Sequence, residues 1–190
     1  MATLSTPFQV TLWCWFAFEV GLLIRDLARS KARARRDRGT RLIVSLSLCG
    51  AIFVGWLATG WVSAWATPAP RLFALAGLAV IWIGLAVRLW AVLALGGAFS
   101  TYVQVESEQT VVTRGPYRWV RHPSYTGLLL ISLGFGIGAG NWLSIIICIV
   151  VPLLGLLPRI AVEESELVRV LGDRYRGYQN QTHRLVPGLW

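Results

Sequence analysis

A run of polar side chains between Gly115 and Gly127 has the residue types needed to bind a small polar ligand. It contains Arg121, His122 and Tyr125, and His122 is one of two histidines in the chain. A proline follows His122 and restrains its backbone to extended conformations. Guanidinium, imidazole and phenol groups placed together suit a ligand with carboxylate, amine or ribose groups. The alternative interpretation is a collar of Arg, Trp and Tyr side chains at a membrane surface.

Paired carboxylates, Glu163 and Glu164, lie further along the chain. Four of the nine acidic residues fall between residues 163 and 173, in a chain whose net charge is +9. A carboxylate here could bind the ammonium of a zwitterionic ligand while an arginine binds the ligand's carboxylate. The competing interpretation is an ordinary solvated helix in which Arg159 and Glu163 form an i,i+4 ion pair.

Arg88 lies inside an apolar stretch, where an ionisable side chain is energetically expensive. The cost is about 2.5–3.5 kcal/mol at the centre of a bilayer, so such a residue usually has a function or a partner. Leu95 ends the stretch seven residues later, which is about 10 Å along a helix. The side chain could be functional, could extend to the lipid head groups, or could pair with Glu19. Glu19 could equally pair with Arg25.

Membrane helices are the elements that position these residues, as the composition indicates. The 190 residues are 55% hydrophobic and 14% charged, with a mean hydropathy of +0.59. A soluble domain carries about 25% charged residues, and the ten tryptophans suit a contact between lipid and water. Eight of the eighteen Lys and Arg residues lie between Arg25 and Arg41, beside an apolar run. That placement indicates membrane orientation or contact with anionic lipid and argues against nucleic-acid binding.

Apolar runs of about 17 to 25 residues can each cross a bilayer, and the sequence offers five candidates. The last two are predicted to form a helical hairpin with two short arms, because Gly138–Asn141 breaks a run too long for one span. A polar helix is expected from Pro158 to about Asn180. The predicted spans are Phe8–Ile24, Leu42–Ala66, Leu72–Leu95 and the two arms of Gly127–Leu157.

Charge asymmetry orients this all-α bundle. With five spans, the loop after the first span, the segment 96–126 and the C-terminus share one side, which holds sixteen of the eighteen Lys and Arg residues. The positive-inside rule makes that side cytoplasmic and places the N-terminus outside. A four-span count would put the basic C-terminus outside, so we prefer five. We expect one membrane domain, 1–190, in which 1–71 supplies two spans and a basic loop and 72–190 carries the candidate ligand-binding residues.

Several kinds of site have no support in the sequence. The three cysteines lie far apart inside apolar runs, with no histidine at metal-ligand spacing, so no metal is expected. The sequence also contains no Gly-rich phosphate loop, nucleophile elbow or dinucleotide-binding fingerprint. A ligand site would therefore be built from the polar residues described above.

Taken together, these segments resemble the isoprenylcysteine carboxyl methyltransferase family of integral membrane enzymes. The resemblance extends from Arg88 to Pro187, and the residues before it match only as generic spans. Its most specific part is the Arg-His-Pro-x-Tyr-x-Gly run followed by the paired glutamates. The matching residues are Arg88, Leu95-Gly96, Phe99, Gly115-Pro-Tyr117, Arg121-His-Pro-Ser-Tyr125, Gly127, Arg159, Glu163-Glu164, Leu167, Gly172, Tyr175, Tyr178 and Arg184-Leu-Val-Pro187.

The resemblance implies a helical membrane enzyme that binds S-adenosylmethionine on the cytoplasmic side and releases S-adenosylhomocysteine. The acceptor it implies is lipophilic, a prenylated cysteine or another lipid or small thiol, and enters from the bilayer. Arg88 would lie near this acceptor, and Arg159 is the second candidate catalytic residue. The short, Arg- and Ala-rich chain also suggests a prokaryotic cell membrane. The implied cofactor contacts are Gln104, Tyr117, Arg121, His122, Tyr125, Glu163 and Glu164.

Two other functions remain open from the sequence. Membrane sterol reductases, which use NADPH, are similar in a His-Pro-x-Tyr-x-Gly run and in a closing Tyr…Arg-Leu-x-Pro pattern. Here Leu128 follows Gly127 where those enzymes have an acidic residue, and the paired glutamates also favour the methyltransferase. A non-enzymatic membrane scaffold that uses the basic loop would bind no cofactor.

Overall fold

The computed structural model describes residues 2–29, 39–96, 111–188 and 190, and its regular elements are helices. Within these ranges there is no strand, and two isolated bridges are the only β-type pairs. The all-α class is therefore confirmed. The elements are α1 (Ala2–Arg29), α2 (Thr40–Trp61), η2 (Ser63–Trp65), α3 (Pro70–Leu95), η4 (Gly115–Arg118), α4 (Pro123–Gly138), α5 (Trp142–Leu171) and α6 (Asp173–Gln179), where η marks a 3-10 helix.

Four of the described helices, α1, α2, α3 and α5, are long and apolar enough to cross a membrane. Many of their large apolar side chains, such as Phe53 and Trp56 on α2, are exposed, as expected for surfaces that face lipid. The chain is thus an integral membrane protein. The apolar helix α4 has 16 residues, or about 24 Å of helix, so the count of five spans stays a prediction.

The last long apolar run breaks between α4 and α5. α4 ends at Gly138, Gly140 adopts a left-handed φ of +69° that suits glycine, and the Asn141 side chain caps α5. The prediction of two short arms is wrong for the second arm, because α5 continues through Pro158 for 30 residues in total. A proline inside a helix can bend it without ending it, and here α5 packs against α2, α4 and α6.

The second span ends earlier than predicted. α2 stops at Trp61 rather than Ala66, and the chain then turns through η2. Val62 leaves helical geometry with φ −127°, and its carbonyl oxygen accepts a hydrogen bond of 2.8 Å from Asn141 Nδ2. Hydropathy could not locate this end, because the chain stays apolar while its backbone turns.

Close packing of α3 against α4 fixes the helices that carry the site. Gly77 and Gly84 on α3 lie opposite Gly134 and Gly127 on α4. A Cβ atom at Gly134 would lie 2.7 Å from the Gly77 carbonyl oxygen, and one at Gly127 would lie 2.8 Å from the Gly84 carbonyl oxygen. Small residues at these positions let the two backbones approach each other.

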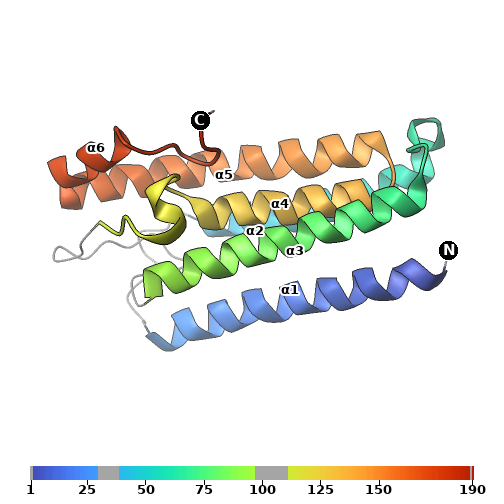
Figure 1. Cartoon of the computed structure of the whole chain (residues 1–190), viewed down its shortest axis with the longest axis horizontal. Helices are drawn as coiled ribbons and strands as arrows, with labels where there is room; N and C mark the ends of the chain where they lie inside the picture. The colour runs from blue at the N-terminus through green and yellow to red at the C-terminus, as the bar shows by residue number, and fades with distance from the viewer. Residues whose placement is uncertain (1, 30–38, 97–110, 189) are drawn as a thin grey trace.

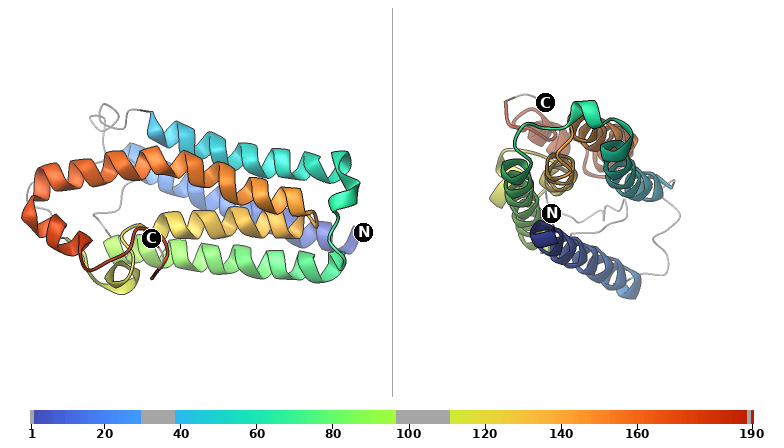
Figure 2. Two further views of the ribbon diagram at one scale, coloured as in Figure 1. Left: turned by 90° about the horizontal axis from the view of Figure 1, so that it is seen from above. Right: turned by 90° about the vertical axis from the view of Figure 1, so that its right-hand side faces the viewer.

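The polar ends of the helices gather at one end of the bundle (Figure 1). The end of α1, the start of α2, the end of α3, the start of α4 and the far part of α5 with α6 all lie there, and the chain's N-terminus lies at the opposite end. Helix α1 packs mainly against α3 and lies at the edge of the bundle (Figure 2). This arrangement agrees with the charge distribution, whereas the side of the membrane remains a prediction.

Candidate active site

The first turn of α4 connects three groups of polar side chains. His122 has non-helical backbone angles (φ −123°, ψ 54°), and Pro123 is the first residue of the helix, where a missing N–H costs no helical hydrogen bond. His122, Ser124 and Tyr125 each contact a different partner from another helix. Residues far apart in the sequence therefore meet around four consecutive residues.

The buried Arg88 on α3 forms an ion pair with the partly exposed Glu19 on α1. Its Nε and Nη2 donate to the two oxygens of the Glu19 carboxylate at 2.6 and 2.7 Å, which is the bidentate geometry that arginine prefers. Its Nη1 donates to Ser124 Oγ at 2.6 Å and to the Ser124 carbonyl oxygen at 3.3 Å. The structure therefore pairs Glu19 with Arg88, one of the alternatives that the sequence left open. All three guanidinium nitrogens have acceptors.

Glu164 on α5 contacts three basic side chains, those of Arg121, His122 and Arg184, and we call these four residues the Glu164 group. Its Oε1 accepts a hydrogen bond from Arg121 Nε at 2.8 Å and lies 3.3 Å from His122 Nε2. Its Oε2 accepts from Arg184 Nε at 3.2 Å. Arg121 Nη1 also donates to the Gln179 carbonyl oxygen at 3.0 Å. The carboxylate is buried, and these basic side chains favour its charged form.

The C-terminal segment reaches this group by backbone pairing. The amides of Arg121 and His122 donate to the carbonyls of His183 and Arg184 at 2.7 and 3.0 Å, and the His183 amide donates to the Trp119 carbonyl at 3.0 Å. This pairing places Arg184 within hydrogen-bond distance of Glu164. The sequence analysis did not select Arg184 as a site residue, although its place in the closing Arg-Leu-Val-Pro run was a signal.

Tyr125 joins α4 to α5 through a second buried network. Its hydroxyl donates to Glu163 Oε2 at 2.5 Å and accepts a hydrogen bond from Arg159 Nε at 3.0 Å. Arg159 Nη1 donates to Thr40 Oγ1 at 3.0 Å, at the start of α2. The Tyr125 ring also stacks on His122, with centroids 5.5 Å apart. Arg159 and Glu163 thus belong to a network across three helices rather than to an exposed pair on one helix.

Tyr117 is buried, and its phenol lies within electrostatic reach of both Glu163 and Arg88. Burial, and then the negative charge of Glu163, raises the pKa of the Tyr117 phenol, while the charge of Arg88 acts in the opposite direction. The Tyr117 carbonyl oxygen accepts a hydrogen bond of 2.7 Å from the Tyr178 hydroxyl, and burial raises the pKa of Tyr178 to about 12. Both phenols therefore stay protonated near neutral pH.

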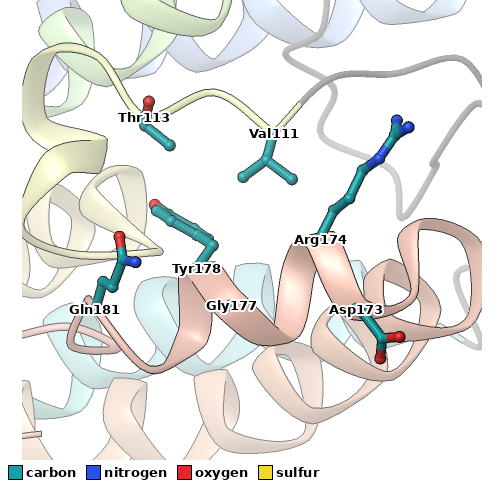
Figure 3. Close-up of a pocket in the computed structure, with 7 residues that line it drawn as sticks. All are labelled: Val111, Thr113, Asp173, Arg174, Gly177, Tyr178 and Gln181. Carbon is teal, nitrogen blue, oxygen red and sulfur yellow. The ribbon is translucent and has the colours of Figure 1, made fainter.

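A cavity of about 390 Å³ opens between the segment 111–113 and α6, a size within the range of about 300–1,000 Å³ that is usual for ligand pockets. Figure 3 shows the Tyr178 ring directed toward the side of Thr113, whereas the Arg174 side chain extends away from Thr113. Tyr178 in its lining precedes Gln179, whose carbonyl accepts a hydrogen bond from Arg121, but none of the predicted site residues that the structure describes lines the cavity. Its lining residues are Val111, Thr113, Asp173, Arg174, Gly177, Tyr178 and Gln181.

A family model described as the isoprenylcysteine carboxyl methyltransferase (ICMT) family matches residues 76–169. This segment contains Arg88, the first turn of α4 and the paired glutamates. This segment of the chain matches the isoprenylcysteine carboxyl methyltransferase family. The resemblance inferred from the sequence is thus confirmed.

Individual members of the ICMT family are similar to the chain over a wider range. It is 37% identical over 113 residues to protein-S-isoprenylcysteine O-methyltransferase of Tribolium castaneum, covering 58% of this chain and 40% of that protein. The protein of the same name from Saccharomyces cerevisiae is 32% identical over 121 residues, covering 63% and 51%. A solved structure of the eukaryotic intramembrane Ras methyltransferase ICMT has a TM-score of 0.62 and 31% identity, covering 78% of this chain and 52% of that chain. The chain therefore spans about half the length of these relatives.

The ICMT-like segment and its surroundings bring together eight of the nine predicted site residues. These eight are Arg88, Tyr117, Arg121, His122, Tyr125, Arg159, Glu163 and Glu164. Gln104 lies outside the described residues. Ser124 was missed as a partner of Arg88, because the sequence does not show which residue of the turn faces α3. Within the described ranges, no three His, Cys, Asp or Glu side chains are grouped as metal ligands.

Proposed function

We propose that the chain transfers a methyl group from S-adenosylmethionine to a lipophilic acceptor at the basic end of its helix bundle. The observation that supports this most directly is the first turn of α4. It holds the membrane-embedded Arg88 through Ser124 and the Glu164 group through His122. An acceptor group near Arg88 and a cofactor near Glu164 would therefore meet around one turn of helix, within the segment that matches the ICMT family.

The described residues fit S-adenosylmethionine by the chemistry of their side chains. The buried carboxylate of Glu164 and the partly buried carboxylate of Glu163 could bind its ammonium, and Arg121 or Arg184 could bind its carboxylate. The stacked rings of His122 and Tyr125 supply aromatic surface, and the cavity beside α6 supplies volume. When bound, the cofactor supplies an electrophilic sulfonium methyl group, which is transferred without a covalent enzyme intermediate.

The protein's own contribution is to position the acceptor and to exclude water. Reacting atoms must be held in line at about 3–3.5 Å, and a site between packed membrane helices keeps bulk water away. Arg88 would orient the polar end of the acceptor, and Tyr117, whose neutral phenol lies within electrostatic reach of Arg88 and Glu163, would help to line this place. Arg159 would hold Tyr125 and Glu163 in place through the bridging hydroxyl. The acceptor class that these residues suit is an apolar chain with one polar end, such as a prenylated cysteine.

The basic end of the bundle is proposed to face the cytoplasm. The helix ends that gather there carry most of the Lys and Arg residues, and the positive-inside rule assigns such an end to the cytoplasmic side. S-adenosylmethionine would then reach Glu164 from the cytoplasm while the acceptor arrives from the bilayer, and the N-terminus would lie outside. The relatives named above come from an insect and a yeast, so the prokaryotic membrane stays a prediction from composition.

Two measurements on purified protein in detergent test this function. Calorimetry should show binding of S-adenosylmethionine and no binding of NADPH, whereas binding of NADPH alone would favour a reductase and refute the proposal. Incubation with methyl-labelled cofactor and a whole-lipid extract should label a lipid product, whose identity names the acceptor. A membrane scaffold would bind neither cofactor and would label nothing.

A further inference from the structure

We propose that Glu19 is a built-in competitor of the methyl acceptor, because its carboxylate occupies the edge of Arg88 that an acceptor carboxylate would bind. An anionic acceptor must displace Glu19 before it can pair with Arg88. Glu19 is then a positioning and specificity-determining residue on α1. This inference builds on the proposed function, in which Arg88 orients the acceptor.

The geometry leaves no equivalent place for a second carboxylate. Nε and Nη2 of Arg88 form the bidentate pair with Glu19, and Nη1 donates to both oxygens of Ser124. Another carboxylate could form the same two-pronged contact only by replacing one of these partners. It would also add a negative charge to a pair that is already neutral, which is unfavourable where the effective dielectric constant is low.

Glu19 is the partner that can leave. Its side chain is 28% exposed, against 5% for Arg88, and it lies on α1, which packs mainly against α3 at the edge of the bundle. Ser124 is buried in the first turn of α4. That turn is held close to α3, since a Cβ atom at Gly127 would lie 2.8 Å from Arg88 Cβ. Displacing Ser124 would require moving α4, whereas displacing Glu19 requires one side chain to turn away.

The packing of α1 gives no separate reason for a carboxylate at this position. Trp15 and Leu22, one turn to either side of Glu19, are buried against Ile81 and Val92 respectively. An apolar residue at position 19 would continue this face at less cost, because a carboxylate in a membrane helix is expensive. Glu19 also precedes the segment that matches the ICMT family model.

The experiment compares Glu19→Gln with the unaltered protein, using an S-prenylated N-acetylcysteine as the carboxylate probe and its methyl ester as the neutral probe. The amide keeps the shape of Glu19 and removes its charge, so competition for Arg88 should fall. Equilibrium binding of the carboxylate probe should tighten by about tenfold or more, with the ester unchanged. In turnover assays KM for the carboxylate should fall to a similar extent while kcat stays within about twofold.

The matched control is Glu166→Gln, which removes a carboxylate from an exposed pair with Arg169 on α5 and should change neither probe. A second variant, Glu19→Ala, should become sensitive to millimolar acetate, which can occupy Arg88 and compete with the carboxylate probe. The unaltered protein should be insensitive to acetate.

Two results would overturn the inference. One is a KM for the carboxylate probe that is unchanged or higher in Glu19→Gln, together with equal changes in the affinities of the two probes. Glu19 would then be only a structural counter-ion of Arg88. The other is a Glu19→Ala variant that acetate does not inhibit. Failure of the proposed function would give a different result. S-adenosylmethionine would then bind neither the unaltered protein nor its variants, while the affinities of the two probes would still show whether Glu19 competes for Arg88.

Discussion

Replacing Glu164 with alanine should destabilise the polar end of the bundle and weaken cofactor binding together. The substitution leaves Arg121 and His122, whose side chains are 9% and 3% exposed, without the carboxylate that they share. Removing one partner of a buried ion pair costs about 3–5 kcal/mol. Arg121 keeps carbonyl acceptors at Gln179 and Thr182, and Arg184 is 41% exposed and can be hydrated. We therefore expect the lower end of the range, about 3 kcal/mol.

The assay is thermal unfolding in mild detergent, followed by calorimetry with S-adenosylmethionine. For a chain of this length, about 3 kcal/mol corresponds to a fall in Tm of about 6–12 °C. The control Glu166→Ala lies on the same helix, but its pair with Arg169 is exposed and is worth about 1 kcal/mol or less. We also expect cofactor affinity to fall by about tenfold or more in Glu164→Ala, the loss typical of one charged hydrogen bond, and to stay unchanged in the control.

Equal shifts in Tm for the two variants would refute the energetic reasoning, because they would mean that the buried group contributes no more than an exposed pair. A large fall in Tm with unchanged cofactor affinity would refute the functional reasoning instead. Glu164 would then hold the C-terminal segment in place without taking part in binding the cofactor.

Three further predictions follow from other parts of the structure. Arg88→Ala should keep cofactor affinity within about twofold and lower methyl transfer by about 100-fold; substantial turnover of labelled product would remove Arg88 from the site. Gly134→Ala should lower stability by about 1–3 kcal/mol, because its Cβ would meet the backbone of α3, whereas Gly50→Ala, with open space around it, should not. The pKa of Tyr178 is raised to about 12 from about 10 in an unfolded chain. Its contribution to the free energy of unfolding is therefore complete below about pH 10 and is lost as the pH rises to about 12. Tyr178→Phe should remove this part of the loss of stability at alkaline pH, measured by unfolding experiments across that range.

Much of the helical fold could be predicted from hydropathy, because membrane spans need long apolar runs. The end of α2 could not, since Asn141 stops that helix through a hydrogen bond from 79 residues away. The full length of α5 was also missed. Pro158 and the polar residues after it suggested the start of a new element. Helix α5 nevertheless continues through them, and it packs against three other helices.

Most of the candidate site could be predicted from motif residues, whereas its connections could not. The sequence suggested Arg88 and Glu164 as important side chains. It did not show whether Arg88 pairs with Glu19 or extends its side chain to the lipid head groups. That choice depends on how α1 packs against α3, which composition does not encode. Ser124 and Arg184 were missed for a similar reason, because a turn and a backbone pairing direct them to residues 36 and 20 positions away.

The backbone pairing between residues 119–122 and 183–184 has a consequence for the order of events during synthesis. Leu185 leaves the ribosome about sixty residues after His122, and chains begin to fold from the N-terminus while they are being made. The helices that surround Arg88 can therefore enter the bilayer and pack before the last contact of Glu164 exists. A nascent chain would therefore hold its membrane core together before Arg184 reaches Glu164, and the proposed cofactor site would be complete only after residues 183–184 have paired with residues 119–122.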